Sequence, residues 1–176
     1  MSLKRITIIS ILLLLKIGQA WGLASDADQP INIDSDSATY DEKQQISTYV
    51  GHVYATQGSI KVDGDKLVVY LKDGNVSKMV ATGQPSHFRQ LPAEGKDEML
   101  GEGLTNEYYP EQNLLIFMHK ASVWQGDAKQ SSEYIQYDTK NSLLKAGEQN
   151  NNNNRVHSVI KPKSKDAPKA KYCLLY

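Results

Sequence analysis

Residues 46–72 read ISTYVGHVYATQGSIKVDGDKLVVYLK, and this stretch decides the fold. Most of its residues are β-branched, aromatic or aliphatic, and the turn signals Gln57-Gly58 and Asp63-Gly64-Asp65 divide it. Runs of this kind are typical of strands, and short connections between them favour antiparallel hairpins. The stretch therefore predicts paired strands at 46–50, 52–56, 60–62 and 66–71.

The rest of the chain after residue 24 continues the same pattern. No window there has a sustained 3.6-residue apolar stripe, so we expect at most one or two short helical turns in an all-β protein. Further strands are predicted at 31–33, 78–81, 86–91, 105–109, 114–118, 121–124, 133–137, 143–146 and 156–160.

The strongest runs, 67–71 and 114–118, are apolar without clear alternation. A strand with apolar residues on both faces is either a central core strand or one whose second face lines a cavity. The pattern leaves both interpretations open.

A weak internal repeat appears when the chain is shifted against itself by 68 residues. Five residues fall on identical ones, and the apolar positions keep phase, with Ile46 and Tyr49 falling on Leu114 and Phe117. The shift predicts two similar β-meanders laid end to end. The identical pairs are Tyr40 and Tyr108, Gln44 and Gln112, Gln57 and Gln125, Gly58 and Gly126, and Lys61 and Lys129.

Residues 1–24 have the features of a cleavable signal peptide. Lys4 and Arg5 precede about ten apolar residues, and Ala20 or Ala24 offers a small residue for cleavage. The apolar run is shorter than the roughly 20 residues of a membrane span. No cysteine that could carry a lipid follows it, so we expect a soluble chain acting outside the cytoplasm.

The mature chain is expected to be one β domain, 25–162, followed by a disordered basic tail, 163–176. Residues 150–154 are five asparagines, which predict a turn or slack loop. The single cysteine, Cys173, cannot form an intramolecular disulfide. No function is assigned to it.

Charge argues against a nucleic-acid partner. The leader and residues 155–176 hold nine of the twenty basic side chains, so 25–154 carries eleven against nineteen acidic ones. Phosphate neutralisation supplies most nucleic-acid affinity, which an acidic body lacks. Asp26, Asp28, Asp34 and Asp36 cluster before the first strands and are interpreted as a solvated entry to them.

No catalytic or metal-binding motif stands out. The four histidines, His52, His87, His119 and His157, have no second histidine or cysteine at ligand spacing. Asp63 and Asp65 fit a hairpin turn better than a calcium loop. We therefore expect a binding protein that is not an enzyme and has no cofactor or metal.

Several segments in order resemble the OstA-like family of periplasmic lipopolysaccharide-transport proteins. The sequence DQPINIDSD at 28–36 matches the start of its mature chains, and GHVYATQGSIKVDGDK at 51–66 matches its G-x-V-x-x-x-Q-G-x-I-x-x-x-x-D-K repeat. The similarity continues in GQPSHF at 83–88, GEG at 101–103 with Tyr108, and RVHSVIKP at 155–162. His119 stands where the family often carries glycine.

The resemblance implies an elongated β-jellyroll of two facing antiparallel sheets, open at both ends. Its interior groove would carry the acyl chains of lipopolysaccharide. Lys61, Lys66, Lys72 and Arg89 could meet phosphates at the rim. The side chains expected to line the groove are Ile31, Ile33, Tyr49, Val53, Leu67, Val69, Phe88, Tyr108, Leu115 and Phe117.

The resemblance also implies head-to-tail homo-oligomers that bridge inner-membrane and outer-membrane lipopolysaccharide-transport complexes containing similar domains. Unpaired strand edges favour strand addition between copies, which gives an open filament. The edge residues expected to pair are Ile31, Asn32 and Ile33 on the first strand and Val156, Ser158 and Ile160 on the last.

Two alternative functions remain open from sequence. One is a periplasmic adaptor that contacts only proteins and carries no lipid. The other is a carbohydrate-active β-sandwich enzyme using Asp63, Asp65 or Glu133.

Overall fold

The structure is a computed structural model that describes residues 26–92, 95–147 and 155–161. The expected signal peptide, asparagine run, basic tail and Cys173 lie outside the described residues. The described chain forms two 3₁₀ turns, η2 (Asp26–Asp28) and η3 (Pro110–Gln112), and ten strands: β1 (Ile31–Asp34), β2 (Ser37–Asp41), β3 (Ile46–Gln57), β4 (Ile60–Lys72), β5 (Asn75–Gln90), β6 (Met99–Tyr109), β7 (Leu114–Gln125), β8 (Ala128–Asp138), β9 (Leu143–Ala146) and β10 (His157–Ile160).

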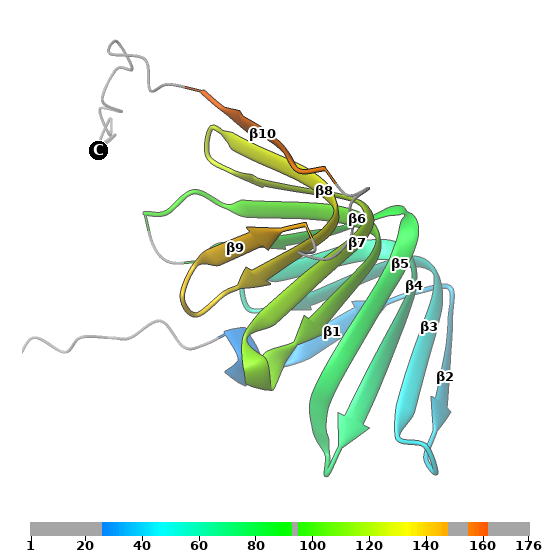
Figure 1. Ribbon diagram of the computed structural model, residues 1–176. Coiled ribbons are helices and arrows are strands. Elements are labelled where there is room, and N and C mark those ends of the chain that lie inside the picture. Colours follow the sequence, from blue (N-terminus) through cyan, green and yellow to red (C-terminus); the bar gives the residue numbers. More distant parts are fainter. Residues whose placement is uncertain (1–25, 93–94, 148–154, 162–176) are drawn as a thin grey trace, which may run out of the picture.

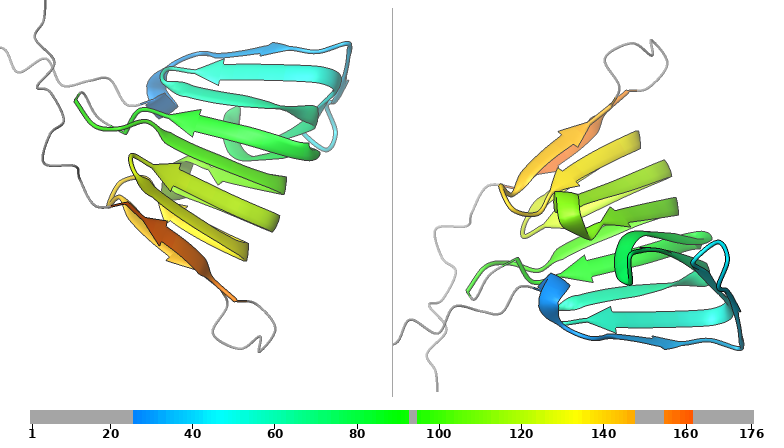
Figure 2. Two further views of the ribbon diagram at one scale, coloured as in Figure 1. Left: turned by 90° about the horizontal axis from the view of Figure 1, so that it is seen from above. Right: turned by 90° about the horizontal axis from the view of Figure 1, so that it is seen from below.

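All ten strands belong to one antiparallel sheet in the order β1-β3-β4-β5-β6-β7-β8-β10. Strand β2 pairs with β3 beside β1, and β9 pairs with β8 beside β10. The strands stack in one direction from the β1 end to the β10 end (Figure 2). Within the described chain the two end edges do not pair with each other, so the sheet is open at both ends.

The long strands are bent at the same level, which turns one sheet into two layers (Figure 1). Register is interrupted in each of the five neighbouring pairs from β3·β4 to β7·β8. A β-bulge bends its strand and increases the local twist. We call this line of interruptions the crease; it comprises residues 51–52, 64–65, 83–85, 104, 119–120 and 133.

Each long strand contributes one half to each layer. Layer 1 contains β1, residues 53–57, 60–63, 86–90, 99–103, 121–125 and 128–132, and β10. Layer 2 contains β2, residues 46–50, 66–72, 75–82, 105–109, 114–118 and 134–138, and β9. The expected all-β fold of two facing antiparallel layers is confirmed, with the refinement that one set of strands builds both.

Several predicted strand boundaries are wrong because the residues of the crease were interpreted as turns between separate strands. The runs 46–50 and 52–56 are the two halves of β3, and 114–118 and 121–124 are the two halves of β7. The sequence reasoning also missed β2, in which every residue is exposed, and the first half of β6, which contains Gly101 and Gly103. Neither segment has the apolar alternation that marks a half-buried strand.

Alternate residues of the strands point between the layers and form the core. In β4 the buried residues are Ile60, Val62, Leu67 and Val69, so the alternation changes phase at the crease. The change of phase keeps both halves of a bent strand facing the same interior. The other completely buried apolar side chains include Phe88, Met99, Leu115, Phe117, Ile135 and Tyr137.

The 68-residue repeat corresponds to two hairpins, β3–β4 and β7–β8. Shifting β3 (Ile46–Gln57) by 68 gives the bounds of β7 (Leu114–Gln125), and the turn residues Gly58 and Gly126 have φ values of 58° and 56°. The crease follows the same shift. Gly51 and His52 have φ values of 83° and 44°, and His119 and Lys120 have 61° and 59°.

His119 therefore adopts the left-handed conformation that glycine adopts at the equivalent position. A side chain there costs roughly 1–2 kcal/mol, because Cβ crowds the following carbonyl. On the other repeat, Gly51 is followed by His52, whose Nδ1 lies 2.8 Å from Asp36 Oδ2. That contact links β3 at the crease to the segment between β1 and β2.

We predict that His119→Gly stabilises the protein by about 1 kcal/mol, because glycine relieves the left-handed strain. Urea denaturation measures the free energy of unfolding. The matched control is His157→Gly on β10, where the backbone is extended and the change should be neutral or destabilising. A destabilised His119→Gly variant contradicts the assignment of strain to this position.

Candidate binding cavity

An apolar cavity lies between the layers near the β1 end of the molecule. Its volume is about 20 Å³, which is room for one water molecule. The interior is therefore closely packed around this cavity. The residues that line the cavity are Ile31, Ala55, Thr56, Gln57, Ile60, Val62, Leu67, Met79, Ala81, Phe88, Asn106, Glu107, Tyr108 and Leu115.

Three aromatic rings connect the layers next to this cavity. Phe88 comes from layer 1, and its ring centroid lies 6.1 Å from Tyr108 and 6.2 Å from Phe117, both in layer 2. The Phe88–Phe117 pair is edge-to-face, with an interplanar angle of 77°. Tilted and edge-to-face pairs at these separations are favourable, so the rings hold the layers together while they exclude water.

Gly101 allows Phe117 to reach across from the opposite layer. A Cβ at residue 101 would collide with ring atoms of Phe117. The Phe117 side chain is completely buried. The glycine at 101 is thus explained by a close approach of side chain to backbone.

A polar contact joins the layers at the crease. The Asn106 Nδ2 group donates to the Ser86 carbonyl and Oγ, each at 2.9 Å, and Ser86 Oγ donates to the Gly103 carbonyl at 3.1 Å. Both side chains are buried. Because strand bonding is interrupted here, these side-chain bonds satisfy polar groups that the ladder leaves unpaired.

We call the turn ends of the strands, which lie away from the crease, the tips of the layers. The 3₁₀ turn η2 lies at the end of the cavity that is next to these tips. The Asp26 carboxylate accepts hydrogen bonds from the Ser59 amide at 2.6 Å, the Ser59 hydroxyl at 2.8 Å and Gln90 Nε2 at 2.9 Å. Burial, and the negative charge of Asp26, raise the pKa of Tyr108 to about 12. Asp26 is thus close enough to the cavity wall to affect its only phenol.

The structure places all ten predicted groove residues in the core cluster between the layers. Seven are buried, and Ile31, Ile33 and Tyr49 are partly buried against them. Five of the ten, Ile31, Leu67, Phe88, Tyr108 and Leu115, line the cavity itself. A role in ligand binding stays a prediction for all of them.

The sequence reasoning missed other inward residues that share the alternation. Ala55 and Ile60 line the cavity, as do Val62, Met79 and Ala81. Each of these five residues lies two positions from another inward residue of the same half-strand. Counting in steps of two from Val53 would have found Ala55, whereas Ile60, Val62, Met79 and Ala81 lie on other half-strands and need a starting residue of their own.

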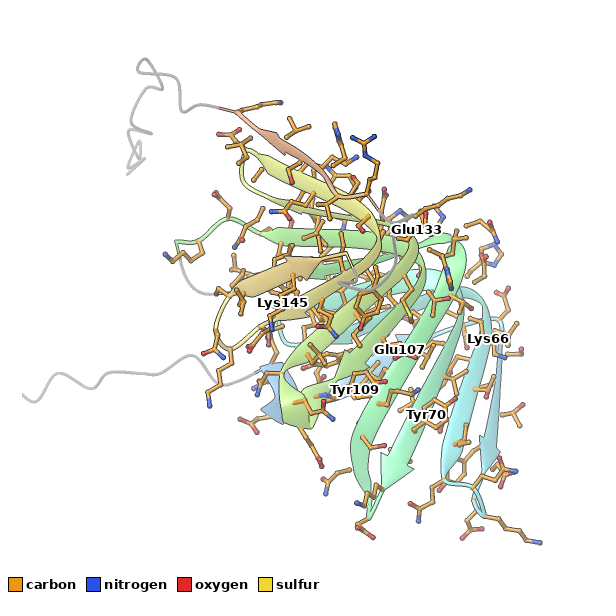
Figure 3. The ribbon with its side chains drawn as sticks, viewed as in Figure 1. Lys66, Tyr70, Glu107, Tyr109, Glu133 and Lys145 are labelled. Atoms are coloured by element: carbon orange, nitrogen blue, oxygen red, sulfur yellow. The ribbon has the colours of Figure 1, made fainter. Side chains whose placement is uncertain are left out.

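Apolar side chains also lie on the outer face of layer 2. Val68, Tyr70, Ile116 and Met118 are partly buried on the outside of layer 2. Figure 3 shows Tyr70, Glu107 and Tyr109 on this face. Lys78 Nζ lies 3.4 Å from Glu107 Oε1 and 5.0 Å from the centre of the Tyr70 ring.

This outer cluster is a stabilising surface network. Tyr109 donates to Glu107 Oε2 at 2.6 Å, and this bond, with some burial, raises the pKa of Tyr109 to about 12. A cation over an aromatic ring covers apolar surface while its charge stays near water. The network covers part of the outer apolar surface of layer 2, at Tyr70 and Tyr109.

The four cations expected at the groove rim are exposed and scattered. Lys61 and Arg89 are register partners on the outer face of layer 1. Lys66 lies next to the crease, and Lys72 lies at the β4–β5 turn. They do not form one rim.

The carboxylates proposed for a carbohydrate-active enzyme are not brought together. Asp63 Oδ2 lies 2.6 Å from His87 Nδ1 on the outer face, and Glu133 lies four strands away on β8. At about 4.8 Å per strand the separation is roughly 19 Å, against about 5–9.5 Å in glycosidases. Asp63 and Glu133 cannot act as a catalytic pair.

Across the described residues, no three histidine, cysteine or acidic side chains gather where they could hold a metal ion. The same part of the chain contains no helix with the length and hydropathy needed to cross a membrane.

A creased antiparallel sheet with an apolar interior and open end edges defines a β-jellyroll fold. A family model described as LptA/(LptD N-terminal domain) LPS transport protein matches residues 32–142. The chain belongs to this family. The family is one of transport proteins, which confirms the prediction that the chain is not an enzyme.

Related proteins support the assignment. The chain is 35% identical over 152 residues to the lipopolysaccharide export system protein LptH of Pseudomonas aeruginosa, covering 83% of this chain and 87% of the relative. It is 30% identical over 145 residues to the lipopolysaccharide export system protein LptA of Escherichia coli K12, covering 81% and 77%.

The fold also matches a solved structure. The crystal structure of LptH from Pseudomonas aeruginosa superposes with a TM-score of 0.74 at 33% identity, covering 79% of this chain and 100% of the other. LptH is described there as the LptA-homologous periplasmic component of the lipopolysaccharide transport device.

We predict that Gly101→Ala destabilises the protein by about 1–3 kcal/mol, because the methyl group overpacks the Phe117 ring. Urea denaturation measures the effect. The same substitution made in a Phe117→Leu background should cost less, since the smaller side chain removes the clash. An equal cost in both backgrounds would show that the Phe117 contact is not the cause.

Proposed function

We propose that the chain is a periplasmic carrier that holds the acyl chains of lipopolysaccharide between its two layers. Copies would assemble head to tail and link inner-membrane to outer-membrane transport complexes that contain similar β-jellyroll domains. The observation that carries the proposal is the continuous apolar interior of a sheet that is joined at the crease and open at both ends.

Burial supplies enough free energy to hold such a ligand. At about 0.8 kcal/mol per buried methylene, one acyl chain of about a dozen carbons contributes near 10 kcal/mol before ordering costs. An exposed ion pair contributes only about 0.2–1 kcal/mol. Scattered exposed cations such as Lys61 and Arg89 therefore cannot replace the apolar interior as the source of affinity.

The small cavity implies that the layers part when a ligand enters. A volume of about 20 Å³ admits one water molecule and not an acyl chain. The layers are covalently continuous only at the crease. We therefore propose that the tips of the layers move apart about the crease, and that the acyl chains then replace contacts between the layers.

The two end edges suit strand addition between copies. β1 and β2 form one edge of the sheet, and β9 and β10 form the other. The Lys161 amide donates to the Asp127 carbonyl, and ladder bonds alternate along a strand, so the amides of Ser158 and Ile160 face away from β8. These amides are available to a strand of another copy.

The charges of the two edges favour contact between unlike edges. Asp34, Asp36 and Asp41 are exposed at the β1–β2 edge, and Arg155 and Lys161 are exposed at the β10 edge. Opposite charges attract and like charges repel, which selects head-to-tail over head-to-head pairing. Unlike edges that pair without closing give a filament.

The location follows from the leader and from the relatives. The signal-peptide pattern at 1–24 exports the chain, and LptH is described as a periplasmic component. The proposed mature molecule is the 25–162 domain with the 163–176 tail.

We predict that a photo-crosslinking residue at Phe88 or Ile33 captures lipopolysaccharide, because both side chains belong to the interior cluster. Mass spectrometry or an antibody against the lipid detects the adduct. The control position is Tyr54 on the outer face of β3, which is 43% exposed. Protein adducts alone at the interior positions would favour the adaptor alternative.

We predict that Ser158→Pro weakens self-association at least about tenfold, since proline removes an outward-facing amide without removing a bond to β8. Light scattering across a concentration series measures the association. Ser158→Ala keeps the amide and should associate like the unaltered chain. The proposal fails if the unaltered chain is monomeric at high concentration, or if Ser158→Pro associates normally while its melting temperature is unchanged.

A further inference from the structure

The three donors that hold the Asp26 carboxylate converge on one point at the tip of the cavity. They are the Ser59 backbone amide, the Ser59 hydroxyl and Gln90 Nε2, at 2.6, 2.8 and 2.9 Å from the two carboxylate oxygens. They come from the β3–β4 turn and the end of β5, which are parts of layer 1. Their positions are therefore set by the sheet and not by η2.

These donors form an oxyanion site. Hydrogen bonds to an ionised acceptor are shorter and stronger than neutral ones. The bond from the Ser59 amide, at 2.6 Å, is shorter than the usual N–H···O distance of about 2.9–3.0 Å. Gln90 is nine-tenths buried, and its Oε1 has no hydrogen-bond partner within the described residues. That oxygen can accept a bond from a hydroxyl group, which Asp26 does not supply.

The oxyanion site and the apolar cavity are adjacent. Ile60 follows Ser59, and Phe88 lies two residues from Gln90 on the same inward face. Both Ile60 and Phe88 line the cavity, together with Tyr108. A ligand with an apolar chain in the cavity would thus carry its headgroup to Ser59 and Gln90.

We propose that Ser59 and Gln90 bind a phosphate monoester on the headgroup of an acylated amphiphile, and that the Asp26 carboxylate fills this site in the empty protein. This inference rests on the proposed carrier function and names a headgroup site for it. A phosphate presents the same acceptor oxygens as a carboxylate, and a monoester or a neighbouring sugar also presents hydroxyl groups to Gln90 Oε1. Phosphate entry displaces η2 from the mouth of the cavity.

In the observed structure, the Asp26 carboxylate then occupies the site that the phosphate would bind. Asp26 is tethered through η2 to β1, so it competes with the ligand at high effective concentration. Removing its carboxylate raises the fraction of molecules whose site is free, and the apparent affinity for a phosphorylated ligand rises by that factor. A ligand with the same chain and a neutral headgroup gains nothing from the freed donors.

The test uses three probes on the full mature chain: dodecyl phosphate, dodecyl maltoside and inorganic phosphate, all below micellar concentrations. Calorimetry gives the affinities, and NMR follows the Ser59 backbone amide. We expect Asp26→Ala to bind dodecyl phosphate at least about threefold more tightly than the unaltered chain, with dodecyl maltoside unchanged. Asp28→Ala, an exposed position on the same turn, is the matched control and should change neither affinity.

A second variant identifies the donors. Adding Ser59→Ala to Asp26→Ala removes the hydroxyl and should abolish the gain for dodecyl phosphate, while thermal melting checks that the fold is retained. An equal gain for both dodecyl ligands would overturn the inference, because η2 would then act only as a cover. If inorganic phosphate alone shifts the NMR resonance of the Ser59 amide equally strongly, the site binds free phosphate and the proposed amphiphilic ligand is wrong.

Failure of this inference is distinguishable from failure of the carrier function. Lipopolysaccharide adducts at Phe88 test the carrier function without involving Asp26. If those adducts form and Asp26→Ala changes no affinity, only the headgroup site is wrong. If no adducts form, the carrier function itself is wrong.

Discussion

The shared bend of the long strands is the constraint on which the rest of the structure depends. A strand alternates its faces with a period of two residues, so both halves of a bent strand must keep their apolar positions on the inward side. At the crease the inward positions of β4, β5, β6 and β8 change phase, whereas β3 and β7 bend through two residues with positive φ and keep their phase. Both layers therefore direct apolar side chains into one interior, and Phe88, Phe117 and Tyr108 can meet there.

On the proposed function, the crease also gives a reason why the protein can be stable without a ligand and still admit one. The interior is packed by contacts between layers, and the Asn106–Ser86 bonds lie beside the crease. The tips are held by side-chain packing and by the Asp26 bonds of η2. Parting the tips loses apolar contacts that acyl chains restore, so the free energy of opening is recovered when the ligand is apolar.

Much of the fold could be predicted from sequence because alternation, turn residues and the 68-residue repeat are local signals. The repeat in particular places β3 and β7 and their turns in register. The crease was harder to predict, since a bulge and a turn share glycine and polar residues. Gly51-His52 and His119-Lys120 separate two runs, and nothing in the pattern says that the chain continues in one strand.

Only part of the candidate site could be predicted from the sequence, for a related reason. Inward residues follow from alternation, so Leu67, Phe88 and Leu115 were predicted to share the interior. Asp26 was interpreted with Asp28, Asp34 and Asp36 as a solvated acidic entry, and for Asp26 this was wrong. Its partners Ser59 and Gln90 lie 33 and 64 residues away, and no local pattern connects them.

The most direct test of the central claim is the distance between the tips of the two layers with and without lipopolysaccharide. Spin labels at the exposed positions Gln125 in layer 1 and Gln112 near the tip of layer 2, with Cys173→Ser as the background, report that distance by pulsed electron paramagnetic resonance. A label pair at the exposed crease residues Asp65 and Glu133, which lie four strands apart, reports the crease. Opening about the crease predicts a longer tip distance on binding and an unchanged crease distance. An unchanged tip distance in chains that have bound lipopolysaccharide would contradict it.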